Sequence, residues 1–340
     1  MRISSAGVST SVRFSSGNTS NYFSMKTNVI LSTIIITASL TAGASACDLC
    51  AFDLPLIRLD NRAGWHAGVS EQYTSYESLR LDGRGIRNPA GQYLHSSITQ
   101  IFVGYDFTRS LGVQLNVPLI SRTFRRTGAG GIETGDVSGF GDVSLLAHWA
   151  PVRIEHDDFR FTARLVAGIK LPTGNSERVL EEANESEGAG PASGVHGHDL
   201  ALGTGSVDGI FGGDTHLQWK RLFLDAGLQV AVRGQGRHDY DFADDLSWHA
   251  EVGAIAWKGD ALKIAIAARL SGETKGEDSF RGVRAADTSS ATVYLGPRVV
   301  ATWRDKFSVD AGFDFPIRTE NSGVQSTPDL RFQAAVSWQF

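Results

Sequence analysis

The chain has 340 residues and a formal net charge of −5, with 41% hydrophobic and 20% charged residues. The excess of negative charge argues against nucleic acid as a partner. The composition resembles that of a soluble protein. However, the 38 glycines and the scarcity of long apolar runs are also typical of a β-barrel in which only every second residue faces lipid.

The amino-terminal segment carries a targeting signal. Met25-Lys26 give a short basic start, residues 29–40 are apolar, and Ala44-Ser45-Ala46 form a cleavage site, so residues 25–46 are predicted to be a secretory signal peptide. The apolar stretch is too short to cross a bilayer as a helix. Residues 1–24 are polar and precede a second methionine. We therefore predict that translation begins at Met25 and that residues 1–24 are not native. Cleavage removes three basic residues and no acidic one, which changes the charge from −5 to −8.

Two cysteines, Cys47 and Cys50, form a C-x-x-C at the start of the processed chain. Three interpretations stay open: a disulfide or inert pair in the oxidising periplasm, lipidation of Cys47 within an imperfect lipoprotein box, and a metal or redox role. Covalent haem attachment is excluded because Ala51 stands where C-x-x-C-H requires histidine. Residues 47–62 are expected to form a short periplasmic segment ahead of the barrel.

From residue 63 onward, apolar and polar residues alternate, which predicts β-strands with one apolar and one polar face. The last strand shows this well, because Phe332, Val336 and Trp338 alternate with mostly polar residues up to Phe340. About twelve strands are predicted, at residues 63–74, 92–107, 110–122, 138–150, 158–171, 206–219, 221–234, 245–257, 260–271, 290–303, 306–318 and 328–340. The predicted fold is all-β: a transmembrane, antiparallel, up-and-down β-barrel over residues 63–340.

Three features favour a membrane barrel over a soluble sandwich. The predicted strands have about 10–14 residues, longer than usual soluble strands and suited to a tilted span. Tryptophans near strand ends fit an interfacial girdle. Links after even-numbered strands are tight, whereas links after odd-numbered strands are long and polar, the longest at about residues 172–205. Outer-membrane barrels have this arrangement, with short periplasmic turns and long extracellular loops.

The carboxyl-terminal Phe340 follows apolar residues at alternate positions. This pattern matches the signal by which bacterial barrel-assembly machinery recognises its clients. We therefore expect the protein in the outer membrane of a Gram-negative bacterium. Its expected partners are that assembly machinery, outer-membrane lipid and lipopolysaccharide, and a small-molecule solute.

Assigning apolar side chains to lipid places the alternate side chains inside the barrel, because Arg or Lys facing lipid near the bilayer centre costs about 2–4 kcal/mol. The predicted basic lumen-lining residues are Arg160, Arg164, Lys170, Arg233, Lys263, Arg269, Arg298, Arg318 and Arg331. The predicted acidic lumen-lining residues are Asp106, Asp142, Asp208, Asp214, Asp225, Glu251, Asp310 and Asp314. This charged but balanced wall fits either a ladder of ion pairs that fills the barrel or a wet polar passage.

The inner face also carries a serine and a histidine that invite comparison with a catalytic pair. Ser144 and His148 share the inner face of one predicted strand. Positions four apart on a strand are roughly 13 Å apart by the strand rise, which is too far for a Ser–His hydrogen bond. We therefore predict no enzymatic activity, no catalytic residues and no cofactor.

In the longest loop, His196, His198 and Asp199 lie close together in the sequence. Two histidines one residue apart, with an aspartate, can bind a transition metal ion at a surface. The alternative is that these loop side chains are simply solvated. The sequence leaves both interpretations open.

Three motifs give the chain a family resemblance: Gly139-Phe140-Gly141-Asp142, Lys170-Leu171-Pro172-Thr173-Gly174, and Gly203-Thr204-Gly205-Ser206 followed by Asp208. In motif order and spacing, the sequence resembles the outer-membrane family named after the meta-pathway of phenol degradation, whose members are regarded as transporters. The resemblance covers most of the processed chain and implies passage of aromatic or hydrophobic compounds. We interpret the motifs as architectural, because glycines allow bends where strands emerge and Pro172 cannot donate to the sheet.

These observations lead to three functional hypotheses. The first is an outer-membrane channel for passive passage of small molecules, aromatic or hydrophobic compounds among them. The second is a structural or interaction protein with an occluded, charged lumen, which displays loops or anchors a periplasmic partner through residues 47–62. The third, an outer-membrane enzyme, has the least support. The inferred ionic lumen departs from a simple hydrophobic channel.

Overall fold

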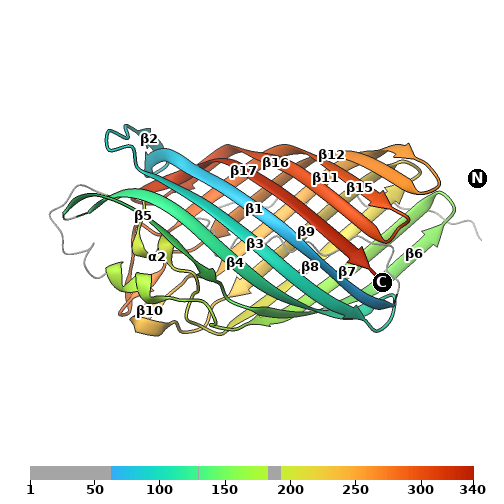
Figure 1. The fold of residues 1–340 in the computed structure, drawn as a ribbon, viewed down its shortest axis with the longest axis horizontal. Coiled ribbons are helices and arrows are strands. Elements are labelled where there is room, and N and C mark those ends of the chain that lie inside the picture. Colours follow the sequence, from blue (N-terminus) through green and yellow to red (C-terminus); the bar gives the residue numbers. More distant parts are fainter. Residues whose placement is uncertain (1–62, 129, 183–192) are drawn as a thin grey trace, which may run out of the picture. The chain divides into compact units, whose positions relative to one another are not determined.

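The structure, a computed structural model, describes residues 63–128, 130–182 and 193–340, which fold into a closed antiparallel β-barrel (Figure 1). Twelve of the described strands form the wall, each pairing with its neighbours along the chain, and the last pairs with the first. The predicted all-β fold is thus confirmed. The predicted signal peptide, together with Cys47 and Cys50, lies outside the described residues.

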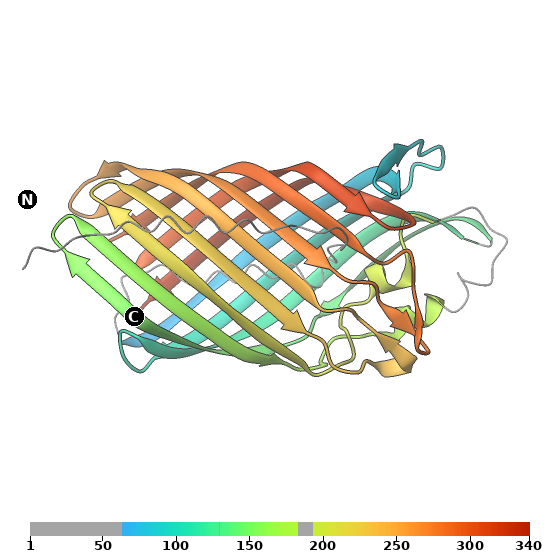
Figure 2. The same cartoon turned by 180° about the vertical axis from the view of Figure 1, so that it is seen from behind.

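The wall strands vary in length and follow one another around the barrel in chain order. They are β1 (Gly64–Leu81), β3 (Tyr93–Asp106), β4 (Leu111–Gly128), β6 (Ser144–His156), β7 (Phe159–Lys170), β8 (Asp208–Trp219), β9 (Leu222–Val232), β11 (Asp245–Lys258), β12 (Leu262–Lys275), β15 (Ser290–Trp303), β16 (Phe307–Asn321) and β17 (Val324–Gln339). Figure 2 shows the opposite side, where the green to orange strands form a continuous wall. The shorter described strands are β2 (Arg84–Ile86), β5 (Gly131–Phe140), β10 (Tyr240–Asp241), β13 (Ser279–Phe280) and β14 (Val283–Arg284).

The described helices are short and belong to the loops. They are η1 (Glu177–Glu181), α2 (Gly197–Leu200) and η2 (Arg237–Asp239). Within the described ranges, no helix is long and apolar enough to cross a membrane.

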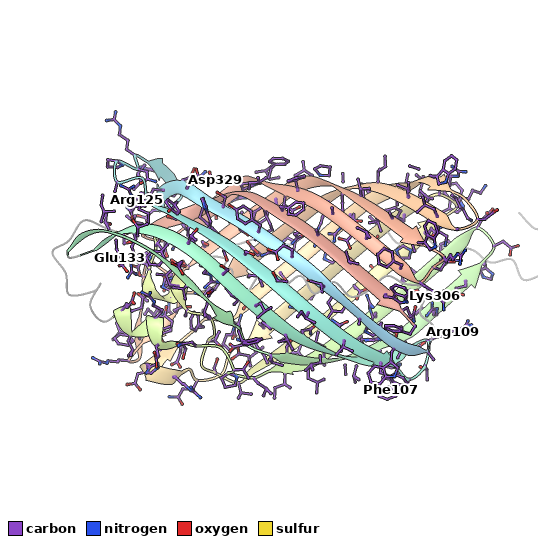
Figure 3. The ribbon with its side chains drawn as sticks, in the orientation of Figure 1. Phe107, Arg109, Arg125, Glu133, Lys306 and Asp329 are labelled. Atoms are coloured by element: carbon purple, nitrogen blue, oxygen red, sulfur yellow. The ribbon has the colours of Figure 1, made fainter. Side chains whose placement is uncertain are left out.

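The two ends of the barrel differ in their connections. At the turn end, where Phe107 lies (Figure 3), links between wall strands have two to four residues. At the loop end, where Glu133 and Asp329 lie (Figure 3), most links are much longer. The longest, residues 171–207, is called the β7–β8 loop below. The link Ser322-Gly323 is an exception to the predicted alternation, because it is a tight turn at the loop end.

Strand β1 extends past its predicted end at residue 74 and continues to Leu81. The prediction ended this strand too early because its pairing is irregular here: Glu77 of β1 and Asp329 of β17 each have no residue opposite them. The Asp329 carboxylate accepts hydrogen bonds from the backbone N–H groups of Glu77 and Ser78 at 2.7 and 2.9 Å. A bulge reverses the alternation of faces beyond it. The period-two pattern therefore ends where the strand itself continues.

Aromatic side chains gather on the outer surface at the turn end. Six of the seven tryptophans are 49–60% exposed there, namely Trp65, Trp149, Trp219, Trp257, Trp303 and Trp338. The exposed ring of Phe340 stacks on Trp338 at a centroid distance of 6.0 Å. These residues form an outer aromatic ring at one end of the wall.

Candidate functional site: the inner wall and the loop in the barrel mouth

Most of the predicted lumen residues lie on the inner face of the wall and form ion pairs across neighbouring strands. On β7 and β8, Arg164 donates to both carboxylate oxygens of Asp214 at 2.8 and 3.0 Å. On β15 and β16, Arg298 donates to Asp310 at 2.7 Å. Cross-strand pairs of opposite charge stabilise a sheet face, so these residues form part of a charged inner wall.

A second group of inner charges involves residues that the sequence pattern did not single out. Arg331 donates to Glu273 and, at 2.9 Å, to the hydroxyl oxygen of Tyr294. On β8 and β9, His216 Nδ1 lies 2.7 Å from Asp225. Other buried members of the predicted set face one another across the sheet: Arg269 lies opposite Glu251, and Asp314 lies opposite Arg331.

Ser144 and His148 do not form a nucleophile–base pair. His148 Nε2 lies 2.9 Å from Asp106, whose other oxygen lies 3.2 Å from His66 Nδ1. The Ser144 hydroxyl accepts a hydrogen bond from Asn116 at 3.1 Å. Each side chain therefore has a separate partner on the inner wall, and the geometry offers no support for catalysis by this pair.

Arg318 lies on the outer surface, so its predicted place in the lumen is wrong. In the pairing of β15 with β16, Val293 lies opposite Arg318 and Tyr294 lies opposite Pro316. The extra residue between them, Ile317, reverses the alternation, and the side chain of Arg318 is 68% exposed beside Glu320.

Two other predicted lumen residues lie close to the turn end. Arg160 is the second residue of β7 and is exposed. Lys263, the second residue of β12, is ion-paired with Asp305 of the turn between β15 and β16. These two side chains therefore stand near the rim of the barrel, away from the middle of its wall.

Five buried charged residues meet at the loop end and are called the rim network here: Asp142, Lys170, Asp208, Arg233 and Asp245. Lys170 Nζ lies 2.9 Å from Asp142 and 2.7 Å from Asp208. Arg233 donates to Asp208 at 2.7 Å and also binds Asp245. Four of the five were predicted lumen residues, and the structure brings those four together in one network.

The rim network holds both arms of the β7–β8 loop, namely the arm that leaves β7 and the arm that returns to β8. Asp142 Oδ1 accepts the backbone N–H of Gly174 at 2.9 Å, and Oδ2 accepts that of Thr204 at 2.8 Å. One step further out, the N–H of Leu202 donates to the carbonyl of Asn175 at 2.8 Å. A single carboxylate thus fixes the points where the loop leaves β7 and returns to β8.

The three glycine-containing motifs of the sequence converge at the same place. The Thr173 hydroxyl donates to the carbonyl of Gly141 at 2.9 Å. A Cβ on Gly203 would lie 2.5 Å from Asp142 Oδ1, and a Cβ on Gly174 would lie 2.5 Å from the carbonyl oxygen of Leu202. These glycines are required because the two arms and the carboxylate approach too closely for any side chain. The motifs therefore form one anchor for the loop.

Beyond the rim network, the β7–β8 loop packs inside the barrel mouth. Val195 and Leu200 are fully buried against Tyr76, Leu94 and Phe124, which are inner side chains of β1, β3 and β4. A second cluster joins the same loop to β3 and β4; its members are Ile98, Ile120 and Leu202. Figure 1 shows α2 of this loop at the loop end of the barrel. The loop therefore narrows the mouth from within.

Buried arginines of β4, absent from the predicted site residues, hold the loop. Arg122 donates to the carbonyl of Ala201 at 2.6 Å, and Arg126 donates to Glu181 at 2.6 Å. The continued alternation of Ile120, Arg122 and Phe124 is the only sequence signal for them. That signal is ambiguous, because the inner face of β4 is partly apolar where the loop covers it.

The three residues of the predicted metal site lie together in the loop. The nitrogen and oxygen atoms that His196, His198 and Asp199 can offer a metal ion all lie within 4.8 Å of one another. His198 Nε2 lies 3.3 Å from Asp199, and its Nδ1 lies 2.8 Å from Glu182. The two imidazole rings stack at a centroid distance of 5.4 Å. Both imidazoles are buried, whereas the side chain of Asp199 is 24% exposed, so the alternative of simply solvated histidines is wrong.

The electrostatics of this histidine cluster favour a protonated His198 between two ionised carboxylates. Burial alone would lower the pKa of His198, but the carboxylates of Asp199 and Glu182 outweigh it and hold the pKa well above the ordinary value of 6.5. Burial alone would raise the pKa of Asp199 and Glu182, and the neighbouring histidines hold both pKa values below their ordinary range instead. The cluster therefore keeps its carboxylates ionised and favours the charged form of His198.

Comparison with known proteins supports the fold. No protein-family model matches the chain, and no curated protein matches it in sequence. A solved outer membrane channel from Pseudomonas putida F1 is similar with a TM-score of 0.57 and 14% identity, over 82% of this chain and 96% of that chain. The transport unit of the autotransporter AIDA-I from Escherichia coli aligns at a TM-score of 0.45 and 10% identity, over 85% and 94% of the two chains. At 14% identity, the likeness to the Pseudomonas putida channel shows the fold alone.

Proposed function

We propose that this protein is an outer-membrane channel through which small molecules pass passively, with the β7–β8 loop narrowing its outer mouth. The observation that carries the proposal is the division of the wall into two faces. Large apolar side chains are exposed all around the outer surface, whereas the inner face holds ion pairs such as Arg164–Asp214 and Arg298–Asp310. A barrel in water would have no reason to expose that much apolar surface, and a barrel in lipid requires it.

The outer aromatic ring supports the same location and suggests an orientation. Tryptophans concentrate where a membrane meets water, and here six of them mark the level of the turn end. In outer-membrane barrels, short turns face the periplasm and long loops face outward. The β7–β8 loop would then lie at the outer mouth, where an entering solute meets it first.

The inner wall suggests the kind of solute. Basic and acidic inner side chains are paired with one another, as in Arg164–Asp214 and Arg298–Asp310, so we expect weak selectivity for ion sign. The family resemblance implies aromatic or hydrophobic solutes. The inner ion pairs offer polar contacts to a solute. Small organic molecules with both apolar and polar parts are the solutes that we propose.

Single-channel conductance in planar lipid bilayers tests the proposal. The wild-type protein is expected to insert in discrete conducting steps. In a second variant, a short Gly-Asn turn replaces residues 176–201; the arms already meet through the Leu202 N–H and the Asn175 carbonyl, so the rim network is kept. We expect several-fold higher conductance from this loop-shortened variant, because the segment that narrows the mouth is gone.

A matched control is deletion of Arg84–Ile86, the exposed strand β2 of a hairpin that extends past the wall at the loop end (Figure 1). This deletion is expected to leave conductance unchanged. A folded wild-type barrel and a folded loop-shortened variant that are both silent would overturn the channel proposal. That result would favour the second candidate, an occluded structural barrel, for which the buried packing of the loop is the supporting observation. Uptake of benzoate against glucose into liposomes tests the solute class.

A further inference from the structure

We infer that the barrel mouth contains a binding site for a divalent transition metal ion such as Zn²⁺, formed by His196, His198 and Asp199, with Glu182 orienting His198. These residues belong to the β7–β8 loop, outside the charged inner wall. Imidazole nitrogens with one carboxylate are a donor set that suits Zn²⁺ and its neighbours.

The spacing of the donor atoms fits a small tetrahedral ion. Zn²⁺ binds nitrogen and oxygen at about 2.0–2.1 Å, so two of its ligand atoms stand about 3.3–3.4 Å apart. His198 Nε2 lies 3.3 Å from Asp199 Oδ1. His196 Nδ1 lies 3.8 Å from Asp199 Oδ2, and all donor atoms lie within 4.8 Å of one another, so a three-ligand site with one open position requires His196 to move toward Asp199.

The second nitrogen of each imidazole faces a different carboxylate. His198 Nδ1 lies 2.8 Å from Glu182, and His196 Nε2 lies 3.5 Å from Asp287. Histidines that bind metals usually donate their other ring N–H to a carboxylate or carbonyl, which fixes the ring and turns its free nitrogen toward the ion. His198 has this arrangement toward Asp199, and Asp287 lies near the second nitrogen of His196 without a hydrogen bond to it.

An unsatisfied atom points to the same ligand. His196 is 4% exposed, and its Nδ1 has no hydrogen-bond partner in the part of the chain that the structure describes. Leaving a buried polar atom unpaired costs about 1–3 kcal/mol. A cation between His196 Nδ1 and Asp199 removes that cost.

A proton competes with a metal ion for the site between the histidines and Asp199. Protonated His198 satisfies Glu182 and Asp199 at the same time, at 2.8 and 3.3 Å. A proton does not connect His196 to Asp199, because 3.8 Å exceeds the length of a hydrogen bond. A metal ion bridges both histidines and the carboxylate, which is why the geometry favours it.

Metal binding would also close the loop on itself. Glu182 belongs to the arm that leaves β7, and His196, His198 and Asp199 belong to the arm that returns to β8. An ion on the second arm tightens the hold of His198 on Glu182 and so joins the two arms above the rim network. Any effect on conductance rests on the proposed channel function, whereas metal binding itself does not.

Titration with Co²⁺ tests the site in the full-length folded barrel in detergent, after treatment with a chelator. We expect one Co²⁺ per chain with the intense visible absorption of a four-coordinate ion, displaced by one equivalent of Zn²⁺. The double variant His196→Ala/His198→Ala is expected to lower affinity by at least about 100-fold. Glu182→Gln acts only through His198 and is expected to lower affinity by about 10-fold to 100-fold.

The matched control is His238→Ala, because His238 is exposed in the η2 segment of the same end and outside the cluster. This variant should bind Co²⁺ like the wild type. Folding of each variant is checked by its heat-modifiable migration in gels, and the wild-type titration stands even if the double variant fails to fold. Absence of saturable Co²⁺ and Zn²⁺ binding to the wild type, or equal binding by the folded double variant, would overturn the site. A barrel that binds the ion but never conducts would refute the channel and leave the site intact.

Discussion

The two ends of this barrel are held together in different ways. At the turn end, neighbouring strands are joined by two to four residues, so the contacts that fix the structure are close in sequence. At the loop end, Asp142 binds backbone groups 32 and 62 positions away, and Arg122 binds a carbonyl 79 positions away. The wall is therefore encoded locally, whereas the mouth depends on a few buried polar groups that act across the chain.

The largest effect is expected from Asp142→Ala at the loop end. The change removes the acceptor of Gly174 and Thr204 and one of the two carboxylates beside buried Lys170. Breaking a buried ion pair from one side costs about 3–5 kcal/mol. We expect the free energy of unfolding in urea to fall by at least about 3 kcal/mol, with faster proteolysis within the β7–β8 loop of the folded barrel.

The matched change at the turn end is Asp158→Ala. The side chain of Asp158 is 67% exposed and lies 3.9 Å from the exposed Lys220. Exposed ion pairs contribute about 0–1 kcal/mol, so little change in unfolding or proteolysis is expected. Similar losses from the two aspartates would contradict the claimed difference between the ends.

A smaller effect is expected from Leu200→Ala, which removes a fully buried side chain between the loop and the inner wall. A cavity of this kind costs about 2–3 kcal/mol when the surroundings relax in part. Leu222→Ala is the comparison, because Leu222 is 56% exposed on the outer surface and fluid lipid or detergent fills the space. We expect it to cost about 1 kcal/mol.

Protease sensitivity of the loop separates these two leucine variants. Only Leu200→Ala should speed cleavage within the β7–β8 loop, since Leu222 has no part in the packing of that loop. Increased cleavage in both variants would mean that the loop depends on the stability of the whole barrel and not on its own contacts.

The difference between the ends also explains what the sequence could predict. Alternation is a local property, so the strand at residues 290–303 agrees with β15 at both of its ends, and Arg164 pairs with Asp214 of the neighbouring strand. The same rule fails at Arg318, because one extra residue in β16 leaves no mark on the composition of either face. Arg122 was missed because its partner, the carbonyl of Ala201, reaches it only through the fold of a distant loop.

The histidine cluster shows the same limit on a smaller scale. His196, His198 and Asp199 are neighbours in the sequence, so their shared chemistry could be recognised without a structure. Glu182, which orients His198, and Asp287, which lies near His196, come from other parts of the chain. Nothing in the sequence spacing could assign them, because loop geometry and not periodicity brings them to the rings.

Asp329→Ala at the bulge of β1 and β17 should have a modest effect. Its carboxylate accepts two backbone N–H groups, from Glu77 and Ser78, but the site is exposed and water replaces part of what is lost. We expect a loss of about 1 kcal/mol in urea unfolding, and an intermediate loss for Asp329→Asn, which keeps one oxygen acceptor. A loss equal to that of Asp142→Ala would show that the bulge, and not the rim network, limits the stability of the loop end.

The smallest effect on stability is expected from Arg318→Ala, and its contrast with Arg298→Ala tests the two faces of the wall. Arg318 pairs with Glu320 on the outer surface, whereas Arg298 pairs with Asp310 inside. We expect Arg318→Ala to change the free energy of unfolding by less than about 0.5 kcal/mol and to leave ion selectivity unchanged.

Arg298→Ala should instead shift the reversal potential toward cation selectivity in a salt gradient across a planar bilayer, because it leaves the carboxylate of Asp310 unopposed in the lumen. Equal shifts from the two arginines would place Arg318 in the lumen and contradict the outer assignment. In the sequence, the alternation of apolar and polar residues assigns both arginines to the lumen. Only the extra residue Ile317 separates their faces, so the pair of variants isolates the consequence of a single bulge.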